Sequence, residues 1–312
     1  MSVIIRNNLP SADVLRDENI FVMRESNAKS QDIRPLKILV LNLMPTKSVT
    51  ESQFLRKLSN SPLQAEIEFI HMVSHTSRNT DPGHMEQYYT TFGAVRHRKF
   101  DGLIITGAPV ETLRFEDVDY WGELCELMRW SETNVFSTLH ICWGAQAGLY
   151  FHYGVNKHSL PQKLSGVFAH ELVNPKSPLF FGCDDRIMMP HSRFTEVRES
   201  EIRRVEALQV MAISDEAGVA IVKSSDNRRF FIFGHPEYDS DTLAKEYFRD
   251  QAAGLGTAVP RHYFPGDDPS NPPTVNWKAN ASLIYSNWLN YYVYQSTSFD
   301  IENIPARSNV ND

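Results

Sequence analysis

The chain has 312 residues, with 31 Lys or Arg against 38 Asp or Glu, so its formal net charge at pH 7 is −7. A hydrophobic content of 42% is too high for a disordered chain, and the 15 glycines follow no collagen-like period. The acidic balance argues against a nucleic-acid-binding protein, which usually carries a basic surplus. A chain of this length can bury a sizeable core.

The cysteines and the first residues indicate a reducing compartment. An odd set of three, Cys125, Cys142 and Cys183, cannot form a complete disulfide framework. The start of the chain lacks the apolar core of about 7–15 residues that a secretory signal needs. No stretch approaches the roughly 20 apolar residues of a membrane span. We therefore expect a soluble, cytoplasmic protein that does not bind membranes.

Along the first half, short apolar runs alternate with amphipathic segments, a pattern typical of a mostly parallel sheet covered by helices. The predicted strands are Ile38–Met44, Ala65–Val73, Gly102–Thr106 and Asn134–Ile141. The predicted helices are Val49–Leu58, His84–Arg98, Glu116–Trp130 and Gly144–Tyr153. The sequence therefore predicts an α/β fold.

Beyond residue 160 the pattern becomes richer in strands. The candidates are Gly166–Leu172, Arg186–Pro190, Ala207–Ser214, Gly218–Lys223 and Arg229–Phe233. Asp239 is a candidate N-cap for a helix that ends at Gly254 and turns Leu243, Tyr247 and Phe248 inward. Residues 258–274 predict a surface loop, and 277–294 a last helix with an aromatic stripe. We expect residues 1–300 to form one domain and 301–312 a flexible tail.

The sharpest local signal is the segment His140–Gly148, in which an apolar strand ends at Cys142 and small residues open a helix. This order is typical of a nucleophile elbow in cysteine form. A helix N-terminus favours the thiolate, and the backbone N–H of Trp143 would face the oxyanion of an attacked carbonyl. Ala108, in Gly107-Ala108-Pro109 after the neighbouring strand, is a candidate second donor. The alternative is that Cys142 is simply a small buried residue.

A thiol nucleophile requires a base, and a candidate follows another strand. The apolar run Phe230–Phe233 leads into Gly234-His235-Pro236-Glu237. His235 can accept the thiol proton, while Glu237 can orient the imidazole and stabilise its charged form. Alone, this pattern is more typical of a loop histidine beside a solvated glutamate. Together with the elbow it favours a Cys–His–Glu site.

Other chemistries have little support in the sequence. His71 with His75, and His140 with Cys142, lack the usual spacing of metal ligands, so we expect no metal. There is no GxGxxG, GxxxxGK[ST] or HExxH motif, which leaves redox chemistry on dinucleotides, nucleotide hydrolysis and zinc peptidase activity without a signal. The basic run at 96–99 is typical of a solvated surface.

Taken together, the C-W-G-A-Q elbow and the later H-P-E resemble the class I glutamine amidotransferase fold, a flavodoxin-like, mostly parallel sheet covered by helices. More specifically, the chain resembles the homoserine O-succinyltransferase and O-acetyltransferase group of methionine biosynthesis. The resemblance runs from the start to about residue 300. Its motifs are Glu18–Met23, Leu41–Pro45, Ser74–Thr80, His140–Gln146, Lys163–Phe168, Pro190–Arg193 and Gly234–Tyr238.

The resemblance implies a role for six side chains. The acyl-thioester nucleophile, the proton acceptor and the partner of that acceptor would be Cys142, His235 and Glu237. Contacts to the substrate would be made by Lys163, Ser192 and Arg249. A Lys and an Arg suit a carboxylate or a developing oxyanion, and a Ser supplies a neutral hydrogen bond.

Glu111 bears on the acyl donor. It stands where the succinyl-using members of the group resemble each other in having Gly. A carboxylate at this position would repel and crowd the free carboxylate of a succinyl group while leaving room for acetyl. We therefore expect acetyl-CoA to be the co-substrate, with succinyl-CoA as the alternative.

The expected reaction is a ping-pong transfer of acetyl from acetyl-CoA to L-homoserine through a Cys142 thioester, without a bound cofactor. One remaining alternative is a glutamine amidotransferase that works with a separate synthetase subunit. Another is a regulatory protein in which Cys142 senses redox state. The aromatic C-terminal helix also suggests a homodimer.

Overall fold

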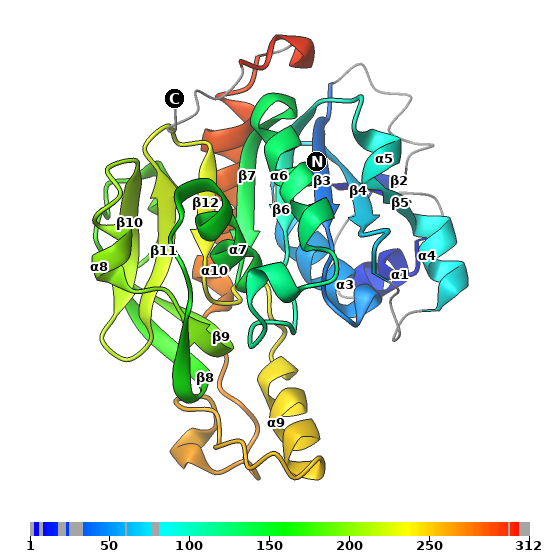
Figure 1. The fold of residues 1–312 in the computed structure, drawn as a ribbon. Helices are drawn as coiled ribbons and strands as arrows, with labels where there is room; N and C mark the ends of the chain where they lie inside the picture. The colour runs from blue at the N-terminus through cyan, green and yellow to red at the C-terminus, as the bar shows by residue number, and fades with distance from the viewer. Residues whose placement is uncertain are drawn as a thin grey trace.

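This computed structural model describes residues 3–5, 9–17, 23–24, 34–59, 61–75, 81–298 and 300–305. Within these residues, twelve strands form one continuous sheet (Figure 1). Parallel pairing joins β1 (Val3–Ile5), β2 (Met23–Arg24), β3 (Leu36–Leu41), β4 (Ala65–His71), β5 (Tyr89–Thr91), β6 (Phe100–Ile105), β7 (Val135–Ile141) and β12 (Arg229–Ile232). Antiparallel pairing adds β8 (His158–Leu172), β9 (Arg186–Glu196), β10 (Leu208–Ser214) and β11 (Gly218–Ser224). The order is β2-β1-β4-β3-β6-β7-β12-β11-β10-β8-β9, with β5 beside β4.

Helices cover both faces of the parallel strands. One face packs against α1 (Ser11–Asp17), α3 (Lys47–Leu58) and α10 (Lys278–Asn287), which continues as the π-helical segment η4 (Trp288–Tyr294). The other packs against α5 (Phe92–Val95), α6 (Trp121–Asn134) and α7 (Trp143–Tyr153). Because both faces are covered, every residue of β6 and β12 is buried, which explains the apolar runs Gly102–Ile105 and Phe230–Ile232 within them. The predicted α/β class and mostly parallel sheet are confirmed.

The remaining helices are short or lie apart from these layers. α9 (Thr242–Ala252) stands beyond the sheet layers, near the bottom of the view in Figure 1. The short elements are α4 (Pro82–Tyr88), α8 (Glu199–Ile202), η1 (Phe115–Asp117), η2 (Pro178–Phe180), η3 (Pro265–Asp267) and η5 (Ile301–Asn303). Most predicted elements are present, with their ends shifted by up to three residues.

Two predicted helices are wrong in extent. The predicted helix His84–Arg98 is split, because β5 separates α4 from α5 and pairs in parallel with β4. The Tyr-Thr-Thr sequence of β5 favours a strand over a helix. The predicted helix Glu116–Trp130 starts only at Trp121, after the separate turn η1.

Strands β8 and β9 are longer than predicted. The predicted ranges 166–172 and 186–190 cover only part of each strand. The additional residues of β8, 158–165, pair with the additional residues of β9, 192–196. Residues 158–164 of β8 are exposed or half-buried, so they show no apolar run that could have revealed the strand. The outer parts of these two strands, which include Lys163 and Ser192, were therefore missed.

Near the C-terminus, three further expectations need correction. The N-cap of α9 is Asp241 rather than Asp239, and Phe248 is 51% exposed rather than turned inward. The predicted surface loop 258–274 buries Tyr263 and Phe264 in a small hydrophobic cluster. These rings replace Phe248 as the apolar contacts of this region.

The aromatic stripe of the last helix lies in the core. Tyr285, Trp288 and Tyr292 are buried within the chain, and the indole N–H of Trp288 donates to Ser137 Oγ at 3.0 Å. These three rings pack within the chain and so are not available to an interface between two copies of it. The homodimer itself stays a prediction.

The expected flexible tail is packed over its first five residues. Ile301 and Ile304 are buried, Lys99 Nζ donates to the carbonyl of Glu302 at 2.6 Å, and Arg228 donates to the carbonyl of Pro305 at 2.8 Å. Residues 306–312 lie outside the described residues, as do Glu18–Val22 and residues 76–80 of the motifs named above.

The packing of the tail can be tested with Ile304→Ala. Removing a buried isoleucine side chain should lower the free energy of unfolding by roughly 2 kcal/mol or more. Glu302→Ala is the matched control, because its exposed side chain can be lost at a cost within about 0.5 kcal/mol. Urea denaturation measures both variants. Equal stability of the two would contradict the packing.

Candidate active site

Cys142 occupies a sharp turn between β7 and α7. Its backbone has φ 50° and ψ −116°, a conformation that is costly for a residue with a Cβ. The backbone N–H of Cys142 donates to the carbonyl of Ile232 at 2.7 Å, so β12 fixes the turn. The predicted nucleophile elbow is present, and it holds the sulfur at the end of the strand.

Glycines around the elbow permit very close packing. A Cβ added to Gly144 would lie 2.6 Å from the carbonyl oxygen of Thr106, so α7 can approach β6 this closely only with glycine there. A Cβ on Gly107 would lie 3.2 Å from Cys142 Cβ and 3.4 Å from His235 Cε1. Gly107 is thus in contact range of both residues, which places the end of β6, the elbow and the histidine together.

His235 and Glu237 follow β12, the strand beside β7. Both side chains are buried, and His235 Nδ1 lies 2.7 Å from Glu237 Oε1. The imidazole stacks on the Tyr238 ring with centroids 4.1 Å apart, and the backbone N–H of His235 donates to the carbonyl of Pro190 at 2.8 Å. The ring is therefore held in one orientation by contacts on several sides.

The charges around His235 favour its protonated form. Burial alone would lower the pKa of this imidazole, but the negative charges of Cys142 and Glu237 outweigh burial and hold the pKa well above its ordinary value. Tyr285 donates a hydrogen bond to Glu237 Oε2 at 3.5 Å, and burial holds its own pKa well above the usual range. The arrangement supports a thiolate–imidazolium pair backed by a carboxylate.

A cavity of about 270 Å³ opens over the sulfur. It brings together most of the residues singled out in the sequence: Ala108, Glu111, Cys142, Lys163, Ser192, His235 and Arg249. Glu237 lies behind His235. Trp143 is buried with its ring against Phe115 and Tyr120, so only its backbone is available to the site. The oxyanion-hole role of Trp143 and Ala108 stays a prediction.

The three predicted substrate contacts are each held by a carboxylate of α9. Lys163 Nζ donates to Asp250 at 2.8 Å, and Ser192 Oγ donates to Glu246 at 2.5 Å. Arg249 forms an ion pair with Asp250 at 2.7 Å. Neither acid could be recognised from the sequence, because a helix with several charges is most often a solvated surface helix.

Glu111 is fixed at the wall of the same cavity. Its Oε2 accepts hydrogen bonds from the backbone N–H of Phe194 at 2.8 Å and from the Thr195 hydroxyl at 3.1 Å. Burial raises the pKa of this carboxyl, and the two hydrogen bonds oppose the rise. The residue therefore adds bulk and a carboxyl group to the cavity that contains Cys142.

The other thiols differ from Cys142 in their surroundings. Burial raises the pKa of both Cys125 and Cys183 to about 11, which keeps them protonated at neutral pH. Within the described ranges, no group of three or more His, Cys, Asp or Glu side chains could hold a metal ion. No helix of the part that the structure describes is long and apolar enough to cross a membrane.

Comparison with solved structures defines the fold class. A glutamine amidotransferase from Thermotoga maritima matches with a TM-score of 0.56 at 11% sequence identity, covering 82% of this chain and 98% of that one. At this identity the likeness shows the fold alone, which is glutamine amidotransferase-like, as the resemblance implied.

Comparison of sequences defines the family. A family model described as homoserine O-succinyltransferase matches residues 2–299. The homoserine O-acetyltransferase of Methanomethylophilus alvi is 56% identical over 304 residues, covering 97% of this chain and 98% of the relative. The corresponding protein of Geobacillus kaustophilus is 54% identical over 302 residues, with coverage of 97% and 100%. The chain belongs to the homoserine O-succinyltransferase family.

Lys57, a buried cation near Glu237, also had no signal in the sequence. It is 4% exposed on α3, and no hydrogen bond or ion pair holds its ammonium group within the described residues. Burial lowers its pKa to about 8, and the Glu237 carboxylate is the main opposing influence. Neighbouring positions of α3 face the same region: Phe54 packs edge-on to Tyr285, and Arg56 pairs with Asp239.

Replacing Lys57 with Met should stabilise the protein at neutral pH. Below about pH 8 the native state carries this buried charge at a cost of about 3 kcal/mol, given 1.36 kcal/mol per pKa unit. As the pH rises from 8 towards the usual lysine value, the unfolded chain binds the proton and the native state does not, so wild-type stability increases. Urea denaturation of both proteins at pH 7 and pH 10 measures this. If the difference in free energy of unfolding between Lys57→Met and wild type is as large at pH 10 as at pH 7, the burial of a charge at this position is contradicted.

Proposed function

We propose that the protein is a homoserine O-acetyltransferase, which transfers acetyl from acetyl-CoA to the hydroxyl of L-homoserine and releases CoA. One observation carries the proposal: Cys142 sits on a strained elbow beside the His235–Glu237 pair, in a cavity bounded by Glu111. The relatives named homoserine O-acetyltransferase, 54–56% identical over nearly the whole chain, support it.

In the first half-reaction, the Cys142 thiolate attacks the thioester carbonyl of acetyl-CoA. Backbone N–H groups of Trp143 and Ala108 would stabilise the tetrahedral oxyanion. The intermediate collapses with loss of the CoA thiolate, which takes the proton of the His235 imidazolium and leaves as the thiol. Because one thioester replaces another, the free energy of the bond changes little, and the acetyl group remains activated on the enzyme.

In the second half-reaction, neutral His235 accepts the proton of the homoserine hydroxyl as its oxygen attacks the enzyme thioester. The intermediate collapses to O-acetyl-L-homoserine and restores the thiolate beside the imidazolium, with Glu237 holding the ring. Water competes as a nucleophile, so the small cavity favours transfer when the acceptor fills it.

The charged groups of the cavity suit a zwitterionic amino acid. Lys163 and Arg249 can bind its carboxylate, while Glu246 can accept from its ammonium group. Asp250 holds both cations in place before the acceptor arrives. Ser192, already hydrogen-bonded to Glu246, adds a neutral contact. No resident cofactor or metal is required by this scheme, and we keep the cytoplasmic location and the homodimer as proposals.

The covalent step is tested by intact-mass measurement. Wild-type protein incubated with acetyl-CoA in the absence of homoserine should gain the mass of one acetyl group, which homoserine then removes. Cys142→Ala should gain none and lose activity by several orders of magnitude, because no other thiol is activated. Cys125→Ala is the control and should acetylate normally. A wild-type enzyme that turns over without ever being acetylated would rule out the thioester route.

The choice of donor is tested with Glu111→Gly. Removing this carboxylate should raise kcat/KM for succinyl-CoA relative to acetyl-CoA by about 10–100-fold, since both bulk and charge repulsion are lost. Thr112→Ala, on the same cavity wall, is the matched control. Wild-type preference for succinyl-CoA would favour the alternative donor. Glutamate release from glutamine would favour an amidotransferase.

A further inference from the structure

The catalytic cavity is too small for the whole acyl donor. Its volume of about 270 Å³ lies below the roughly 300–1,000 Å³ of sites that bury a drug-sized ligand, and CoA is larger than such ligands. The nucleotide end of CoA therefore has to bind elsewhere, within reach of the pantetheine arm.

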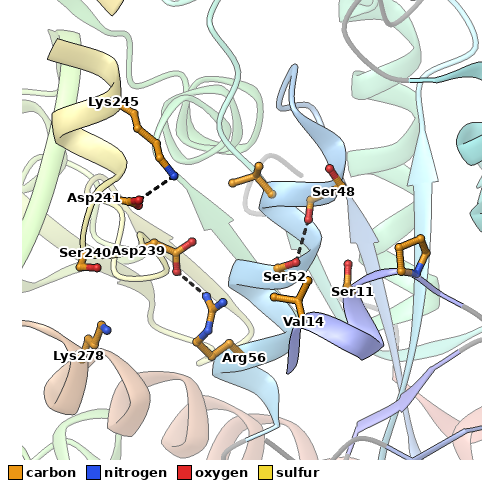
Figure 2. Close-up of a pocket in the computed structure, with 12 residues that line it drawn as sticks. Ser11, Val14, Ser48, Ser52, Arg56, Asp239, Ser240, Asp241, Lys245 and Lys278 are labelled. Carbon is orange, nitrogen blue, oxygen red and sulfur yellow. Dashed lines mark hydrogen bonds and ion pairs between the residues drawn. The ribbon is translucent and has the colours of Figure 1, made fainter. Parts of the chain in front are cut away.

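A second and larger cavity, of about 780 Å³, lies along α3 (Figure 2). One wall is formed by Ser48, Ser52 and Arg56, which repeat every four residues along one face of that helix. The opposite wall comes from the segment that leads into α9, and the first residue of α10, Lys278, lies nearby. The volume falls inside the range for a nucleotide-sized ligand.

The two cavities adjoin each other at more than one point of the chain. Tyr238 lines the catalytic cavity and the next residue, Asp239, lines the second one. The same change occurs on α9, where Lys245 lines the second cavity and Glu246 the catalytic one. Consecutive Cα atoms are about 3.8 Å apart, so the two cavities lie within a few ångströms of each other along these segments.

The lining of the second cavity combines cations, carboxylates and apolar surface. Arg56 pairs with Asp239 of the opposite wall at 2.5 Å, and Lys245 pairs with Asp241 one turn earlier on its own helix at 2.7 Å. Lys278 is exposed and has no hydrogen bond or ion pair among the described residues. Two valines, Val14 and Val49, expose apolar side chains at the cavity.

This combination matches the chemistry of a phosphorylated adenosine. Phosphate groups suit the Lys and Arg side chains, and ribose hydroxyls or the adenine amino group suit Asp239 and Asp241. The purine ring suits the valine side chains. Resting on the proposed function, we propose that this cavity binds the 3′-phospho-ADP end of acetyl-CoA while its thioester lies at Cys142.

A third cavity is a less suitable place for the nucleotide. It is lined by Glu111, Arg114 and Lys157 and also borders the catalytic site, but its volume is only about 230 Å³. The ammonium group of Lys157 already donates to the carbonyls of Glu111 and Leu113. Arg114 nevertheless gives a matched control, because it is an exposed cation next to the same active site.

The test measures binding of adenosine 3′,5′-bisphosphate by calorimetry, which requires no catalysis. Wild-type protein and Cys142→Ala should bind it with similar affinity. Lys278→Glu should bind at least tenfold more weakly, because it replaces an unpaired cation with an anion, whereas Arg114→Glu should bind normally. Absence of binding to wild type, or a loss in Arg114→Glu but not in Lys278→Glu, overturns the assignment.

Kinetics with two donors separate this inference from the proposed function. Lys278→Glu should raise KM for acetyl-CoA at least tenfold but leave KM for S-acetylpantetheine, which lacks the nucleotide, within twofold of wild type. Equal effects on both donors overturn the inference. If wild type transfers acetyl from neither donor, the proposed function fails, and the bisphosphate titration still decides whether a nucleotide site exists.

Discussion

The parallel pairing of β7 with β12 is the constraint on which the site depends. Ile141 lies beside Ile232 at the ends of these strands, although about ninety residues separate them in the chain. The strand ends place Cys142 and His235 at one edge of the sheet, and the hydrogen bond from the Cys142 N–H to Ile232 holds the strained turn there. The strain at Cys142 is thus offset by pairing that the sheet requires anyway.

The electrostatics of the site follow from burial of this pair. Cys142, His235 and Glu237 lie together with little access to water, so the two acids stabilise a protonated imidazole between them more strongly than they would in solvent. Lys57 and Tyr285 extend this group behind Glu237. On the cavity side, Glu246 and Asp250 of α9 position the cations that would bind the acceptor.

The sequence predicted the parts of the fold in which local pattern and tertiary role agree. Strands buried on both faces appear as apolar runs, and the small residues after Cys142 mark the elbow, so β6, β7 and α7 were found. The outer part of β8 is paired but not buried, so it shows no apolar run. The strand preference of β5 extends over only three residues, too few to mark an element between two helices. Glu246 and Asp250 were missed because their importance comes only from what lies across the cavity from α9.

The position of α9 has a thermodynamic consequence. Neighbouring residues of this helix, Lys245 and Glu246, line different cavities, so one rigid element forms a wall of both. A displacement of the helix by an occupant of one cavity therefore alters the shape of the other. Linkage then requires the effect to be reciprocal. If an occupant of one cavity changes the affinity of the other cavity for its ligand, that ligand changes the affinity for the first occupant by the same factor.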